Sequence, residues 1–217
     1  MAMIPFVKKR NADAVKIVSM FPKKEDYGQY IDPYVGFGDI LLNLRPTRAI
    51  ISDPDPDIVN VWRSIKDFPE RFIKELLLLK NTNVNHLLKY LSKNKRRTVR
   101  RAAYFLTLQV GINAVLNKSN MDKIRRMSEY MAKNSISVVY AKDPMKIIKM
   151  AKKNDLVYLD STRDNDKSIS TLVRKLPDKK FRVFIADDGD IQRHGIDFRK
   201  YKLKKLPSKH YKVVVFK

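Results

Sequence analysis

The stretch Tyr30-Ile-Asp-Pro-Tyr-Val-Gly-Phe-Gly38 decides the fold of this chain. Its first half is apolar enough for a buried strand, and its second half carries two of the chain's 6 glycines. Because glycine lacks a Cβ, a turn at Gly36 and Gly38 lets a ligand approach the backbone. A helix is expected from Ile40 to Leu44, and helix amino termini favour electron-rich groups. This order of strand, glycine turn and helix predicts the ligand-binding edge of a sheet.

A second apolar strand is expected over Arg48–Ser52, and Asp53 ends it. An acidic residue at this position typically accepts hydrogen bonds from ribose hydroxyls. We therefore predict a nucleoside pocket at the carboxyl ends of two neighbouring strands, with Gly36, Gly38 and Asp53 as binding residues. The same residues also fit a plain strand-to-helix turn in which Asp53 caps the next helix. The sequence leaves both interpretations open.

Strand-like segments recur further along the chain, at residues 135–140, 155–159, 182–186 and 212–216. Helical patterns separate several of them, and this alternation is typical of an α/β sheet. Residues 67–133, by contrast, read almost entirely as helix. We expect an α/β core built from residues 1–66 and 134–217, interrupted by a basic helical insertion over 67–133. The terminal strand is expected to pair antiparallel at or near an edge.

The composition narrows the classes of function. The chain has 217 residues, and 46 Lys and Arg against 23 Asp and Glu give a formal net charge of +23. Such a surplus favours a nucleic-acid partner, although a solubilising coat or a lysine-rich proteome would give the same count. There is no cysteine, and the 3 histidines lie far apart, so we expect no metal site. No apolar run approaches the roughly 20 residues of a membrane span, and no signal-peptide pattern begins the chain. We expect a soluble, intracellular protein.

The densest positive cluster is Lys93-Asn-Lys-Arg-Arg-Thr-Val-Arg-Arg101. On a continuous helix its four arginines would share one broad face. Their mutual repulsion would be relieved by phosphates, and binding through phosphates depends steeply on salt. A solvated helix face would show the same pattern. We predict the following nucleic-acid-binding residues: Lys93, Lys95, Arg96, Arg97, Arg100, Arg101, Lys118, Arg125 and Arg126.

Three ordered stretches carry a resemblance to a known family: Asp32–Gly38, Ala49–Asn60 and Asp155–Asp160. They resemble, in this order, the cofactor loop, the second cofactor motif and the strand before the catalytic motif of Dam-type DNA adenine-N6 methyltransferases. The resemblance implies a Rossmann-like methyltransferase sheet with an inserted target-recognition domain. It also implies S-adenosylmethionine as the family's cofactor and DNA as the partner. Within these motifs it adds Tyr34 to the cofactor residues and makes Asp160 the catalytic residue.

Two motifs depart from the family pattern. The catalytic motif D-P-P-Y is replaced by Asp160-Ser-Thr-Arg163, which keeps the carboxylate but loses both prolines and the base-stacking aromatic. The amino-terminal motif P-F-x-K-W-x-G-G-K is reduced to Pro5, Phe6 and Lys8. The two changes together predict a scaffold on which Asp160 is a relic and methylation has been lost.

The sequence therefore predicts a nucleic-acid-binding protein on a degenerate methyltransferase scaffold, with a coating, packaging or accessory role. No cofactor is expected, unless the pocket still holds S-adenosylmethionine. Two alternatives stay open. One is an active DNA adenine-N6 methyltransferase with a non-standard catalytic loop, and the other is a structural or regulatory subunit with protein partners or further copies of itself.

Overall fold

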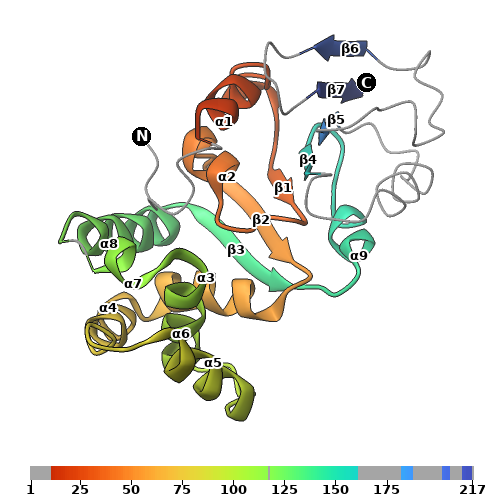
Figure 1. Ribbon diagram of the computed structural model, residues 1–217. Helices are drawn as coiled ribbons and strands as arrows, with labels where there is room; N and C mark the ends of the chain where they lie inside the picture. Colours follow the sequence, from red (N-terminus) through yellow and green to blue (C-terminus); the bar gives the residue numbers. More distant parts are fainter. Residues whose placement is uncertain (1–10, 117, 161–181, 188–201, 206–211, 217) are drawn as a thin grey trace.

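One sheet organises the protein. The computed structural model describes residues 11–116, 118–160, 182–187, 202–205 and 212–216. Within these residues, seven strands lie in the order β3-β2-β1-β4-β5-β7-β6 (Figure 1). Their bounds are β1 Tyr30–Asp32, β2 Arg48–Asp53, β3 Ser135–Tyr140, β4 Leu156–Asp160, β5 Arg182–Asp187, β6 Lys202–Lys205 and β7 Lys212–Phe216. The first five strands in chain order pair in parallel. The predicted α/β class, a Rossmann-like methyltransferase sheet, is confirmed.

The terminal strand β7 is antiparallel, as expected, and it pairs with both β5 and β6. It is therefore one position in from the end of the described sheet, where β6 lies. The strand at residues 202–205 is not among those expected from the sequence. Its sequence, Lys-Leu-Lys-Lys, lacks the apolar alternation of a half-buried strand.

The helices connect these strands and gather mainly on one side. Their bounds are α1 Asn11–Val18, η1 Lys24–Asp26 (a 3₁₀ turn), α2 Asp39–Leu44, α3 Pro56–Asp67, α4 Pro69–Leu77, α5 Val84–Lys93, α6 Val99–Val110, α7 Ile112–Val115, α8 Lys118–Lys133 and α9 Pro144–Ile148. Figure 1 shows the yellow-to-green helices α4–α8 in one group, with α9 lying apart from them. The described part of residues 67–133 consists of these helices and the loops between them. That this segment is an insertion stays a prediction. No helix among the described residues combines the length and apolarity needed to cross a membrane.

Local signals explain where the central helices begin. The side chain of Asp55 accepts a hydrogen bond from the Asp57 amide and caps α3, and Pro56 follows at the first helical position. Thr98 caps α6 in the same way by accepting from the Arg101 amide. The helix α5 has already ended at Lys93. The expectation that Arg96, Arg97, Arg100 and Arg101 share one helical face is therefore wrong, because the first two lie in the loop over 94–98 and the last two lie in α6.

Two buried clusters cover the two faces of the sheet. Along β2, Ala49 and Ile51 belong to the larger cluster, while Ile50 belongs to the smaller cluster beside α9. This alternation follows from the two-residue period of a strand. Trp62 of α3 and Phe72 of α4 lie in the same large cluster as the strand residues. The helices of residues 67–133 therefore extend the core of this face of the sheet.

The strand order fixes where a ligand site can form. The chain runs outward from β1 to β3 and then crosses to β4 on the other side of β1, so the order reverses between β1 and β4. Ligands of such sheets bind outside the carboxyl ends of the strands at this switch point. Asp32 ends β1, Asp53 ends β2 and Asp160 ends β4. Three carboxylates therefore lie along one edge of the sheet.

Candidate functional site

The predicted glycine loop is held in place by Asp53. One carboxylate oxygen of this buried residue accepts from the Gly36 amide at 2.9 Å, and the other accepts from the Asp55 amide at 2.9 Å. The loop is also tied to β2 by the Val35 amide, which donates to the Ser52 carbonyl at 2.8 Å. The structure therefore brings Gly36 and Asp53 together. The helix cap that the sequence left open for Asp53 belongs to Asp55.

The ribose role of Asp53 stays a prediction. The glycine loop lets a ligand approach the backbone, and a carboxylate at the end of the neighbouring strand suits ribose hydroxyls. The residue types at this edge therefore suit the nucleoside part of S-adenosylmethionine.

The ring of Trp62 leaves no room for a side chain at position 38. Gly38 has φ 78° and ψ 28°, a left-handed conformation that glycine adopts most easily. A Cβ on Gly38 would lie 2.4 Å from Cζ2 of Trp62, whose side chain is almost completely buried. The same indole donates from Nε1 to the Gly36 carbonyl at 2.7 Å. Trp62 therefore shapes the glycine loop, a contribution that its helical spacing with other apolar residues did not signal.

The carboxylate of Asp32, at the end of β1, also lies at this edge of the sheet. This carboxylate accepts from the Tyr30 hydroxyl at 2.8 Å and from the Tyr34 amide at 3.1 Å. Burial, followed by the charge of Asp32, raises the pKa of Tyr30 well above its usual value, so this hydroxyl stays a donor. Tyr34 follows β1 as predicted, and its side chain is buried in the smaller cluster, beside α9. The residue thus anchors the loop through its backbone amide and its packing.

Asp160 ends β4 and is buried. Because β4 is the neighbour of β1 in the sheet, Asp160 lies at the same edge as the glycine loop. The departure from the catalytic motif falls on Ser161, Thr162 and Arg163, which lie outside the described residues. The reduced amino-terminal motif at Pro5, Phe6 and Lys8 also lies outside them.

Arg101, predicted to bind nucleic acid, is instead part of the interior. The residue is 6% exposed, and its guanidinium makes a two-pronged ion pair with Asp57, with Nε–Oδ1 and Nη2–Oδ2 distances of 2.8 and 2.6 Å. Its remaining terminal nitrogen donates to the carbonyls of Leu91, at 2.8 Å, and Asn94. The Asp57 hydrogen bond is the main cause that raises the pKa of Arg101. Arg101 therefore fastens the end of α5 to the start of α3, and the expectation of an exposed cation is corrected.

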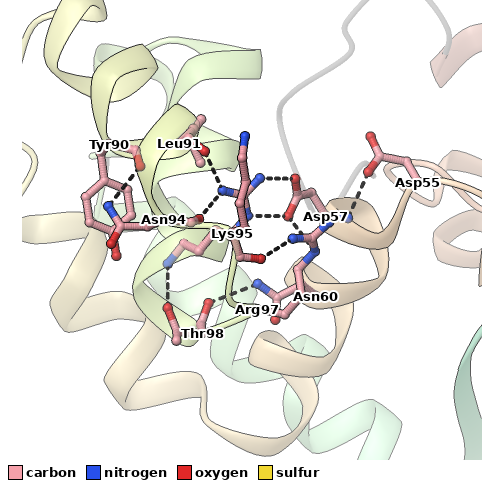
Figure 2. Close-up of polar contacts among 10 residues, drawn as sticks. Asp55, Asp57, Asn60, Tyr90, Leu91, Asn94, Lys95, Arg97 and Thr98 are labelled. Carbon is pink, nitrogen blue, oxygen red and sulfur yellow. Dashed lines mark hydrogen bonds and ion pairs between the residues drawn. The ribbon is translucent and has the colours of Figure 1, made fainter.

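Three other predicted cations also have carboxylate partners. Arg97 Nε lies 3.0 Å from Oδ1 of Asp57, which it shares with Arg101, and Figure 2 shows this contact beside the loop residues Asn94 and Lys95. Arg100 pairs with Glu75 at 2.8 Å. Arg125 pairs with Glu70 at 2.7 Å and with Asp122 at 3.2 Å. The first two pairs neutralise part of the positive cluster over residues 93–101, and the third neutralises Arg125 of α8.

Four predicted cations remain exposed and form no ion pair with the residues that the structure describes: Lys93, Lys95, Arg96 and Arg126. Three of them belong to the end of α5 and the loop before α6, and Arg126 belongs to α8. The side chain of Lys118 lies outside the described residues. Among the described residues, no cluster of three or more metal-binding side chains is present.

The fold is that of an α/β protein with a Rossmann-like sheet and an attached helical group. Residues 11–127 match the D12 class N6 adenine-specific DNA methyltransferase family, and the chain belongs to this family. The matched region includes the glycine loop, Asp53, the helices α3 to α7 and part of α8, while β4 and Asp160 lie beyond it. The family suggested by the sequence motifs is thereby confirmed.

A curated relative points to the same group. The chain is 30% identical over 164 residues to the Type II methyltransferase M1.LlaDCHI of Lactococcus lactis subsp. cremoris. The similarity covers 63% of this chain and 57% of the relative. The chain thus spans somewhat more than half the length of this relative.

Proposed function

We propose that this protein binds DNA through a cationic surface carried on an adenine-methyltransferase scaffold, and that it does not transfer methyl groups. The proposed absence of methyl transfer rests on one observation: the sequence Asp160-Ser-Thr-Arg163 stands where the family has D-P-P-Y. Base–aromatic stacking is worth about 1–3 kcal/mol per base, and a guanidinium lacks the apolar face of a ring. A coating, packaging or accessory role, alone or within a larger assembly, follows from binding without chemistry.

The helical insertion over residues 67–133 is the proposed DNA-facing part. The loop between α5 and α6 presents Lys93, Lys95 and Arg96, each exposed and without a carboxylate partner among the described residues. Arg101, which is paired with Asp57, donates to the carbonyl of Leu91 in α5 and to that of Asn94 at the start of this loop. Its cations are thus presented from an anchored loop, which suits contacts to a DNA backbone.

Neutralising the loop cations tests this surface. The triple variant Lys93→Gln, Lys95→Gln, Arg96→Gln should bind a duplex more weakly, whatever its sequence. The slope of log K against log salt should fall by about 0.9 for each phosphate that the variant no longer binds. The measurement is fluorescence anisotropy with labelled duplexes at several salt concentrations.

A matched control removes the same charge elsewhere. Lys146, Lys152 and Lys153 are exposed and belong to the α9 side of the molecule. The variant with all three changed to Gln should lower affinity much less. Equal losses in the two triple variants would mean that DNA responds only to net charge, and the loop would not be a binding surface.

The alternative, an active methyltransferase, is favoured by the preserved edge of the sheet. Gly36, Gly38 and Asp53 would hold S-adenosylmethionine, which supplies the electrophilic methyl group, and Asp160 would accept a hydrogen bond from the target amine. The hydrogen bond that the Gly36 amide of the loop donates to Asp53 supports this interpretation.

A methyl-transfer assay separates the two proposals. The protein is incubated with labelled S-adenosylmethionine and DNA of mixed sequence, beside Asp160→Ala. We expect no transfer above the level of that variant. Transfer that disappears in Asp160→Ala would contradict the proposed loss of chemistry. Calorimetric titration with S-adenosylmethionine reports separately whether the glycine loop still binds it.

A further inference from the structure

A second cationic site lies at the opposite edge of the sheet from Asp53. A surface pocket of about 430 Å³ is lined by Lys24, Arg45, Thr47, Arg126, Lys133 and Asn134, together with Glu129. Thr47 precedes β2, and Asn134 precedes β3. The pocket therefore faces the amino ends of these strands. A strand as long as β2, at about 3.3 Å per residue, places it about 20 Å from the glycine loop.

The charges in this pocket are not balanced by its own residues. Four of the side chains that line the pocket are cationic, and one is a carboxylate. Lys24, Arg126 and Lys133 form no ion pair within the described part of the chain. The carboxyl ends of α2 and α8 lie beside the pocket, and each contributes about half a negative charge. The lining therefore has an excess of cations, which suits the backbone phosphates of a nucleic acid.

The pocket is preformed by contacts between its walls. The Tyr130 hydroxyl on α8 donates to the Pro46 carbonyl at 2.6 Å, and the Ser135 amide donates to the Thr47 carbonyl at 3.0 Å. The carboxyl end of α8 is thereby fixed against the turn between α2 and β2. In that turn Arg45 has φ 48°, a left-handed position at which glycine is the commonest residue. The chain thus carries a cation at the position where glycine would be easier to accommodate.

We propose that this pocket binds phosphates of a nucleic-acid strand, as a second contact separate from the loop between α5 and α6. This inference rests on the proposed function, because it takes the same class of partner. The Arg101–Asp57 pair ties that loop to the start of α3, which follows the carboxyl end of β2. The pocket lies at the amino ends instead, so one protein would contact nucleic acid at two separate places. Such a chain can hold two segments of DNA together, as a packaging role requires.

Lysine footprinting tests the pocket on the intact protein. The chain is acetylated with and without a duplex of about 30 base pairs, close to three helical turns, and mass spectrometry measures each lysine. We expect several-fold slower acetylation at Lys24 and Lys133 in the complex, and no change at the exposed Lys152 and Lys153. In a second measurement, Lys24→Gln, Arg126→Gln, Lys133→Gln should lower the salt slope by about 0.9 for each phosphate that the variant no longer binds.

The outcomes separate this inference from the proposed function. Protection of Lys93 and Lys95 without protection of Lys24 and Lys133 would overturn the pocket site and leave DNA binding intact. An unchanged salt slope in the pocket variant would have the same meaning. A protein that binds no duplex at low salt would contradict both proposals.

Discussion

Changing Asp57 to alanine is expected to lower the free energy of unfolding by about 3–5 kcal/mol, the usual cost of leaving a buried charge without its partner. The guanidinium of Arg101 would lose both of its hydrogen bonds to the carboxylate while the residue stays 6% exposed. Arg97 would lose the same partner. Urea denaturation followed by circular dichroism measures the change, and a loss of this size is a large fraction of the stability of a typical domain.

A matched surface pair provides the control. Glu70 pairs with Arg125 in a similar two-pronged geometry, but both side chains are largely exposed. Water solvates whichever partner remains after Glu70→Ala, so its effect should be far smaller. The double variant Asp57→Leu, Arg101→Leu should lose less than the sum of the two single changes, because it leaves no unpaired charge at this position. Equal losses of unfolding free energy in Asp57→Ala and Glu70→Ala would show that burial does not determine how much an ion pair stabilises this protein.

This ion pair also shows why part of the cationic site escaped prediction. The sequence displays Arg101 as one member of a basic run, while its partner Asp57 lies 44 residues away and becomes its neighbour only through the packing of α3 and α6. The loop between α5 and α6, by contrast, had a local signal. Thr98 immediately before the apolar residue Val99 is a typical helix cap, and it would have divided the run correctly.

The candidate cofactor edge was easier to predict because its signals are local. A strand, a glycine turn and an acidic strand end lie within about 25 residues of one another, since the spacing of such units is limited by strand and loop length. The structure adds a contact that the sequence pattern could not reveal: the Gly36 amide donates a hydrogen bond to the carboxylate of Asp53. At Gly38 the close neighbour is the ring of Trp62, whereas the sequence suggested a bound ligand. That contact depends on how α3 packs over the loop.

Gly38→Ala is expected to destabilise the protein by about 2–4 kcal/mol, through two separate costs. An added methyl in a packed core typically costs about 1–3 kcal/mol, and here it would lie 2.4 and 2.7 Å from two carbons of the buried indole. A left-handed conformation adds about 1 kcal/mol for a residue with a Cβ. The hydrogen bond from Trp62 to Gly36 would shift with the ring, so S-adenosylmethionine binding, if present, should weaken as well.

Gly111→Ala measures a conformational cost without crowding. No heavy atom of the described residues beyond its chain neighbours lies within 4 Å of the position that its Cβ would take. Its φ of 87° and ψ of 147° lie in a region that almost only glycine occupies, so its substitution should cost about 1–3 kcal/mol from conformation alone. The crowding at Gly38 is isolated in a Trp62→Phe background, whose smaller ring lacks the atoms that crowd Gly38. There the cost of Gly38→Ala should fall towards its own conformational part, about 1 kcal/mol. If thermal denaturation gave the same cost in both backgrounds, the indole would not be what requires glycine at this position.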